Sequence, residues 1–228
     1  MHQILAAAAY IVYAVFGLRL IWHFLLWTRT SQAIGNVYRF KQKTSIATIM
    51  LMAIDIISFR RMMVASGPLW FGSLVFHLSF LIVSLGHLRF FTEPVPGCIQ
   101  DLQSCGLIAG YLLPASVVYL MSIRILSAKN RYLTYHNYLI LALVFGISAT
   151  GLLTRTVFKV DLVAVKGFAY GLLTFHPGLL KDSYLFAFHF ALVLFLVVIL
   201  PSHIFSAPLV IIEARRREQE LNMVMHDK

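Results

Sequence analysis

Five long stretches of the chain are almost uninterrupted runs of apolar residues, and polar segments separate them. Each run is long enough to cross a hydrocarbon core of about 30 Å as an α-helix, because a helix rises about 1.5 Å per residue. The pattern therefore predicts an all-α integral membrane bundle of five transmembrane helices in a single domain. We place the spans at about residues 3–27, 69–91, 104–127, 136–154 and 183–207.

The connecting segments add three expectations. The polar 28–68 loop contains an apolar run of 14 residues, 46–59, which is too short to span a membrane and suits an amphipathic helix at the interface. Such a helix serves either as a lipid anchor or as a docking surface for a soluble partner. The 155–182 loop carries a semi-apolar stretch, 162–175, that is a candidate cap of the bundle, and the charged tail is 208–228.

Composition supports a membrane protein and its charge gives an orientation. The chain is 60% hydrophobic, with a mean hydropathy of +0.81 and a net charge of +10, whereas soluble domains are about 45–50% apolar. Thirteen of the 19 lysines and arginines lie in the 28–68 loop, the 124–131 segment and the tail, against five on the opposite side. The positive-inside rule then predicts an outside N-terminus and a cytoplasmic C-terminus, and it explains the charge without a nucleic-acid partner.

The second predicted span carries two histidines, His77 and His87, ten residues apart. This spacing separates them by about 15 Å along a helix, so that each lies near a different side of the membrane. An imidazole inside a membrane costs free energy unless it is hydrogen-bonded or ligates something. Two of them on one helix suggest two ligands for two buried groups.

The fifth span supplies matching partners, His189 and His203, which are fourteen residues or about 21 Å apart. Because the two spans run antiparallel, His77 lies at the depth of His203, and His87 at the depth of His189. Two cross-helix pairs at two depths are typical of two bis-histidine b-type haems. Hydrogen-bonded packing histidines are the plainer alternative, and zinc would need one four-ligand cluster.

Two further positions, Arg19 and Gly86, have both a plain and a functional interpretation, and two further histidines have one interpretation each. Arg19 either extends toward the membrane interface or pairs with a cofactor carboxylate. Gly86 leaves space beside His87 for a macrocycle or a quinone head, or it permits close helix packing. His176, in the sequence FHPG, is expected on the outer side near His87 and His189, where it is a candidate residue of a quinone site. His136 has no matching partner and is expected at the membrane interface.

The two cysteines, Cys98 and Cys105, are seven residues apart on the predicted outer side. The chain has no Cys-x-x-Cys-His sequence, which excludes covalent attachment of a c-type haem. The spacing leaves open either a disulfide or two unlinked small side chains.

The segments LVFHLSFLIVSLGHL, TFHPG and FHFALVLFLVVILPSHIFSAP resemble the gamma subunit of respiratory nitrate reductases. The same membrane cytochrome b superfamily includes the cytochromes of heterodisulfide reductases and of complexes linked to dissimilatory sulfite reduction. The resemblance covers all five spans and is strongest in the second and fifth.

The resemblance implies a quinone-reactive, electron-transfer subunit of a multi-subunit respiratory oxidoreductase in the cytoplasmic membrane of a prokaryote, which is not catalytic alone. It implies two haem b groups, with His77 and His203 ligating the inner haem and His87 and His189 the outer haem. A quinol, menaquinol by preference, is expected near Gly86 and His87, and the electrons are expected to reach a cytoplasmic iron–sulfur subunit.

The sequence departs from the nitrate reductase pattern in two places. The histidines of the fifth span are closer together by about one turn, and no lysine lies between Arg89 and Arg124, where nitrate reductases carry one associated with quinol. The loop HLRFFTEPVP is closer to the heterodisulfide reductase branch, which favours a cysteine-rich iron–sulfur partner over the nitrate reductase beta subunit. The rival hypotheses are a haem-free transporter or channel and a structural anchor, both with intramembrane histidines. We see no internal repeat, which disfavours a transporter.

Overall fold

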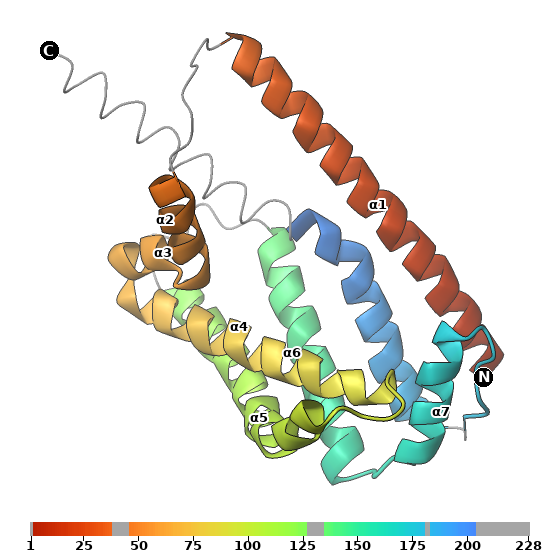
Figure 1. The fold of residues 1–228 in the computed structure, drawn as a ribbon. Helices are drawn as coiled ribbons and strands as arrows, with labels where there is room; N and C mark the ends of the chain where they lie inside the picture. The colour runs from red at the N-terminus through yellow and green to blue at the C-terminus, as the bar shows by residue number, and fades with distance from the viewer. Residues whose placement is uncertain (1, 38–45, 127–134, 181–182, 204–228) are drawn as a thin grey trace, which may run out of the picture.

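The computed structural model describes residues 2–37, 46–126, 135–180 and 183–203, and within these ranges every regular element is a helix (Figure 1). The predicted tail, 208–228, lies outside the described residues. In chain order the elements are α1 His2–Val37, α2 Ile46–Ile57, α3 Arg60–Ala65, α4 Gly67–His87, the 3-10 turn η1 Leu88–Phe90, α5 Gly97–Leu126, α6 Tyr135–Thr156, α7 Leu162–Leu173 and the Tyr184–His203 helix.

Among the described residues, five helices are long and apolar enough to cross a membrane. The protein is an all-helical, multi-pass membrane bundle, as the sequence predicts. The five segments are His2–Arg29, Gly67–Phe90, Gly97–Leu126, Tyr135–Thr156 and Tyr184–His203.

Two helices extend well beyond the predicted spans: α1 continues to Val37 rather than ending near residue 27, and α5 starts early. This helix begins at Gly97 rather than near residue 104, so that the second half of the expected 92–103 loop is helical. The amides of Ile99 and Gln100 donate to the carbonyl of Pro96, at 3.0 and 3.2 Å, and begin the helix. Hydropathy marks the limits of the membrane, whereas a helix continues until a residue breaks it, and the polar 98–103 segment contains no proline or glycine.

The predicted interfacial run, 46–59, folds as the helix α2, and a second short helix, α3, follows it. The chain turns between α2 and α3 at Phe59, which has a left-handed backbone (φ 51°, ψ 33°). A non-glycine residue rarely adopts this conformation, which costs on the order of 1–3 kcal/mol. The indole Nε1 of Trp70 in α4 donates to the carbonyl of Ser58 at 2.8 Å and holds this corner against the bundle. An exposed apolar stripe along α2 suits a membrane interface; it consists of Ile46, Met50, Ile54 and Ile57.

Two apolar clusters form the core. The first joins α4, α5, α6 and the Tyr184–His203 helix, with Val117 and Leu120 of α5 almost completely buried at its centre. The second joins α1, α7 and the beginning of the Tyr184–His203 helix around Phe168, which is fully buried. The Tyr184–His203 helix contributes to both clusters and therefore connects the two halves of the bundle.

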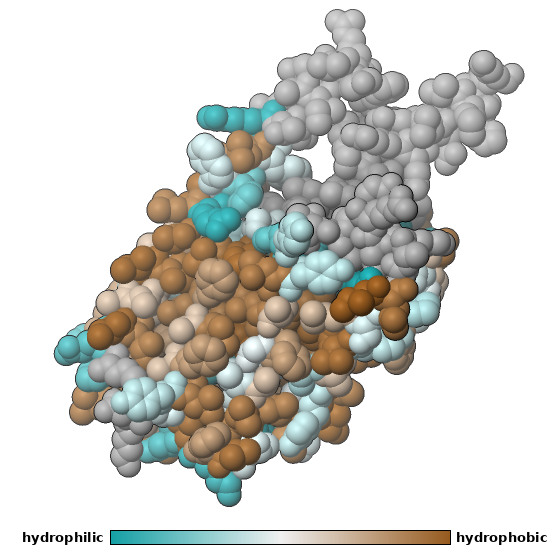
Figure 2. Space-filling model, turned by 180° about the vertical axis from the view of Figure 1, so that it is seen from behind, coloured by the Kyte–Doolittle hydropathy of each residue, from teal (hydrophilic) through white to brown (hydrophobic). Residues whose placement is uncertain are grey.

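Helix α1 lies at the side of the bundle, next to the Tyr184–His203 helix (Figure 1). The phenol of Tyr10 donates to the carbonyl of Leu172 at 3.3 Å, and the guanidinium of Arg19 donates to that of Val198 at 2.8 Å. Many large apolar side chains of α1 are exposed, as expected for a helix that faces lipid. Figure 2 shows a broad hydrophobic surface over the bundle, with hydrophilic residues gathered toward its ends.

The bundle has two different ends. At one end α3 packs against α4 and α2 packs against α3, and we call this the α2–α3 end. At the other, which we call the α7 end, α7 packs against η1. The carboxylate of Asp161 caps α7 by accepting hydrogen bonds from the amides of Val163 and Ala164, at 3.0 and 3.2 Å. Gly171 allows the following chain to fold back on α7, because an added Cβ would lie 2.8 Å from the Cα of Pro177.

Candidate functional site

The four histidines of the predicted pairs lie on two helices, α4 and the Tyr184–His203 helix, and the structure brings them together two by two. The rings of His87 and His189 are close enough to interact electrostatically at the α7 end. His77 and His203 do so at the α2–α3 end. These are the pairings that the antiparallel order of the two spans predicts.

At the α7 end, hydrogen bonds to backbone carbonyls fix the tautomer of both imidazoles. The Nδ1 of His87 donates to the carbonyl of Val83 at 2.7 Å, and the Nδ1 of His189 donates to that of Ile147 at 3.1 Å. The hydroxyl oxygen of Thr150 lies 3.0 Å from the same Nδ1 of His189. Because a carbonyl can only accept, each Nδ1 carries the proton and each Nε2 keeps its lone pair.

Gly151 of α6 allows the ring of His189 to lie directly against the helix backbone. A Cβ added to Gly151 would be 3.2 Å from the Cε1 of His189, closer than nearly all real contacts of this kind. Thr150 and Gly151 therefore hold the imidazole ring of His189, Thr150 by a hydrogen bond and Gly151 by close packing. Neither residue was singled out by the sequence, because their contacts with His189 bridge about 40 residues of chain.

At the α2–α3 end, His77 is held by its own helix and by two aromatic rings. Its Nδ1 donates to the carbonyl of Ser73 at 2.7 Å. Its ring centroid is 4.7 Å from that of Phe59 and 4.9 Å from that of Phe76. The left-handed corner at Phe59 therefore brings the α2–α3 segment into direct contact with His77, one of the predicted haem-ligating histidines.

His136, which the sequence left without a partner, lies within electrostatic range of His203. The α2–α3 end thus contains three histidines rather than two, on α4, α6 and the Tyr184–His203 helix. The signal available in the sequence was the depth of His136, at the beginning of a span that starts on the same side as His77. Sequence spacing alone could not place α6 beside the Tyr184–His203 helix.

The donor set fits haem iron better than a bare metal ion. Within the part of the chain that the structure describes, no three His, Cys, Asp or Glu side chains gather to hold an ion. A b haem needs only two protein ligands, because the porphyrin supplies the other four nitrogens. In His77, His87 and His189 the Nδ1 hydrogen bond orients the ring and leaves Nε2 as the ligand atom, which is the usual support of a metal-binding imidazole.

The remaining predicted site residues are Arg19, Gly86 and His176. The guanidinium of Arg19 donates to the carbonyl of Val198 in the Tyr184–His203 helix. Pro201 lies in the next turn, where its missing N–H removes a helix hydrogen bond. The space beside Gly86 is open, since an added Cβ meets no described atom within 4 Å. His176 is exposed, and its Nδ1 donates to the carbonyl of Thr174 at 2.7 Å. No contact among the described residues joins His176 to His87 or His189.

A disulfide between Cys98 and Cys105 is excluded. Both side chains are free and exposed, and both lie on the single helix α5. Seven residues of helix separate their Cα atoms by about 10 Å, and a disulfide requires less than about 7 Å.

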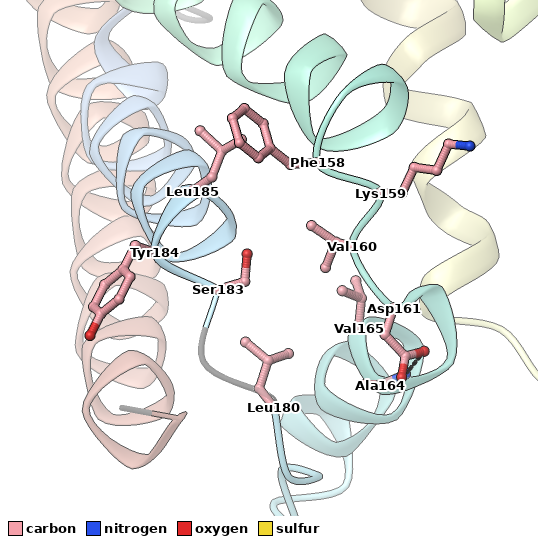
Figure 3. A pocket seen from close by; sticks show the side chains of 10 residues that line it. All are labelled: Phe158, Lys159, Val160, Asp161, Ala164, Val165, Leu180, Ser183, Tyr184 and Leu185. Atoms are coloured by element: carbon pink, nitrogen blue, oxygen red, sulfur yellow. Dashed lines mark hydrogen bonds between the residues drawn. The ribbon is translucent and has the colours of Figure 1, made fainter.

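A cavity of about 570 Å³ opens at the α7 end, between the segment that joins α6 to α7 and the beginning of the Tyr184–His203 helix (Figure 3). Its walls are mainly apolar. The hydroxyl of Ser183 points toward the cavity, whereas the ring of Tyr184 points away from it. Leu185, another lining residue, is one helical turn before His189.

Comparison with known proteins gives two curated relatives. Both are called Hdr-like menaquinol oxidoreductase cytochrome b-like subunit. The protein of Archaeoglobus profundus is 34% identical in an alignment of 149 positions that covers 58% of this chain and 44% of the relative. The protein of Archaeoglobus fulgidus is 31% identical in an alignment of 149 positions that covers 58% of this chain and 45% of the relative.

The chain is therefore similar in sequence to two Hdr-like cytochrome b-like subunits. This result confirms the predicted resemblance, and it favours the heterodisulfide reductase branch over the nitrate reductases. The chain spans less than half the length of the curated relatives it matches. No family model matches the sequence, and no solved structure matches it.

Proposed function

We propose that this protein is a dihaem b-type cytochrome, the quinone-reactive membrane subunit of a respiratory oxidoreductase complex. The observation that carries the proposal is the pairing of four histidines from two antiparallel helices, one pair at each end of the bundle. The names of the relatives, which contain both cytochrome b and menaquinol, support the same reading.

In this proposal each end of the bundle holds one haem. His87 and His189 are its ligands at the α7 end, and His77 and His203 at the α2–α3 end. The hydrogen bonds from Nδ1 to Val83, Ile147 and Ser73 fix three of the four rings with Nε2 available. The bound haem irons would supply one-electron transfer along the bundle.

The charge distribution assigns the α7 end to the outside and the α2–α3 end to the cytoplasm. Menaquinol is oxidised near the α7 end, where the space beside Gly86 is open and the cavity of Figure 3 lies one turn from His189. Two protons leave on this side, and two electrons cross the membrane one at a time. The prokaryotic cytoplasmic membrane is the expected location.

A cytoplasmic iron–sulfur subunit of the cysteine-rich, heterodisulfide reductase-like type is the proposed electron partner. It docks at the α2–α3 end, where the basic pair Arg60–Arg61 lies on α3. Phe59, the residue just before this pair, touches His77, so that the docking surface and the inner histidine pair adjoin each other.

The decisive experiment is a redox difference spectrum of the purified chain together with a haem-to-protein ratio. We expect a b-type spectrum and two haems per chain. One haem would show that one of the two pairs does not bind iron. A chain with no haem after expression in a haem-sufficient host would favour the structural anchor or the haem-free transporter.

The position of the quinol is tested by the rate at which a menaquinol analogue reduces the purified protein. Gly86→Leu fills the open space beside His87, and Ser183→Leu fills the cavity of Figure 3. The variant that raises the analogue concentration for half-maximal rate identifies the site. Equal, unchanged kinetics in both variants would place the quinol elsewhere.

A further inference from the structure

Two arginines lie at the α7 end beside the outer histidine pair. Arg89 is in η1, directly after α4, and Arg155 is in the last turn of α6. They belong to different helices, yet their guanidinium groups are close enough to repel each other electrostatically. Neither residue was given a role by the sequence or by the proposed function.

Arg89 lies two residues after His87, in the 3-10 turn η1 that follows α4. The guanidinium carbon of Arg89 is 4.8 Å from the ring centroid of Phe90, and that ring is 5.9 Å from the ring of His87. Arg89 and His87 also interact electrostatically.

Arg155 approaches the same pair from α6. It follows Gly151 by four residues and therefore lies on the same helix face, one turn further toward the α7 end. Gly151 is the residue whose backbone lies against the ring of His189. The two arginines thus flank the two members of one histidine pair, Arg89 next to His87 and Arg155 one turn beyond His189.

The nearby acidic side chains are already engaged. Glu93 forms an ion pair with Lys166, and Asp161 caps α7. No acidic side chain among the described residues pairs with Arg89 or Arg155. Two cations held near each other at the edge of an apolar bundle repel, and an anion between them would relieve the repulsion.

We propose that Arg89 and Arg155 form a carboxylate-binding site that holds the propionates of the haem at the α7 end. This inference rests on the proposed dihaem function. A b haem carries two carboxylates at one edge of the ring, and a guanidinium binds a carboxylate through two parallel N–H groups. The site takes over the role that the sequence offered to Arg19, whose guanidinium is hydrogen-bonded to the backbone at Val198.

The test uses Arg89→Gln, Arg155→Gln and the double variant in the full chain, with Lys166→Gln on α7 as a control that removes a positive charge at the same end. The haem-to-protein ratio is measured first. The midpoint potentials of both haems are then titrated, and the haem lost in His189→Ala identifies the one at the α7 end.

We expect each arginine variant to lower the midpoint potential of the haem at the α7 end, because a cation favours the reduced form. The expected change is roughly tenfold in the reduction equilibrium constant, or about 59 mV for a one-electron couple. The other haem and the Lys166→Gln control should change little. Mere proximity of charge would produce part of this shift, so the pH dependence is the second readout.

Loss of a guanidinium raises the pKa of a propionate that it had held ionised. The potential of this haem should therefore rise as the pH falls from about 8 to about 5 in the variants, and less so in the wild-type chain. Arg155→Lys keeps the charge and should restore most of the wild-type potential.

The outcomes separate the two proposals. A wild-type chain without haem overturns the proposed function. A wild-type chain with two haems whose potentials and pH dependence survive both glutamine substitutions overturns the arginine site alone. The titration is repeated in nanodiscs of phosphatidylcholine with and without phosphatidylglycerol. An effect of the variants that requires the anionic lipid would assign the site to a lipid phosphate and overturn the propionate assignment.

Discussion

The two ends of the bundle hold their histidines in different ways. At the α7 end, His87 and His189 form one pair, and His189 is fixed by Ile147, Thr150 and Gly151 of the neighbouring helix α6. At the α2–α3 end, His77 is fixed by its own helix and by Phe59 and Phe76. There His203 has two histidine neighbours, His77 and His136.

The comparison shows that neighbouring residues fix the histidine pair at the α7 end, whereas the α2–α3 end offers two alternative histidine pairs. A ring held by another helix has little freedom, so the α7-end pair has a single arrangement. Three histidines at the α2–α3 end allow two ligand pairs on geometric grounds. The short spacing between His189 and His203, with Pro201 between them, raises the same question from the sequence.

The largest expected effect is the loss of a whole haem at the α7 end. His87→Ala and His189→Ala should each lower the haem-to-protein ratio from two to one and remove the same spectral component, because a bis-histidine haem loses an axial ligand either way. His176→Ala is the control and should retain both haems. Loss of different components in the two variants would contradict the pairing.

The choice at the α2–α3 end is decided by a second pair of variants. We expect His203→Ala to reduce the haem-to-protein ratio to one and His136→Ala to leave it at two, since the proposed ligand partner of His77 is His203. The optical spectrum and the haem assay are the measurements. The reverse result would make His136 the ligand and the prediction for His203 wrong.

An intermediate effect is expected from packing against His189. Gly151→Val adds a side chain whose Cβ alone would lie 3.2 Å from the ring of His189. The substitution should therefore displace His189 and lower the occupancy of the haem at the α7 end. Overpacking of this kind costs about 1–3 kcal/mol. Haem content and thermal unfolding are measured, with Gly17→Val as the control because an added Cβ there meets nothing within 4 Å. Equal behaviour of the two variants would contradict the contact.

The smallest effect is expected from the hydrogen bond between Thr150 and His189. Thr150→Val keeps the shape but removes the hydroxyl 3.0 Å from Nδ1, while the carbonyl of Ile147 still accepts. The loss should be about 1 kcal/mol, seen as a small drop in thermal stability of the haem-loaded chain. Thr156→Val removes a hydroxyl that bonds only its own helix, to Leu152, and serves as the control. A haem spectrum altered as much by Thr156→Val would remove the special role of Thr150.

Much of the fold could be predicted from apolar runs, because a membrane requires about 20 consecutive apolar residues for each helix. Helix ends were less predictable, since the polar beginning of α5 and the end of α1 lie beyond the apolar runs. The corner at Phe59 was also missed, because a left-handed non-glycine residue leaves no signal in composition. The disulfide question was settled by helix geometry, once Cys98 and Cys105 were found on α5.

The sequence by itself determined the membrane class, the five apolar spans and the two depths of paired histidines, because the bilayer imposes length and polarity on every helix. Only the tertiary structure decided which helices lie beside one another. It brought Thr150 and Gly151 against His189, His136 toward His203, and Arg89 toward Arg155. These contacts join residues far apart in the chain, and they depend on how helix surfaces pack rather than on the period of any one helix.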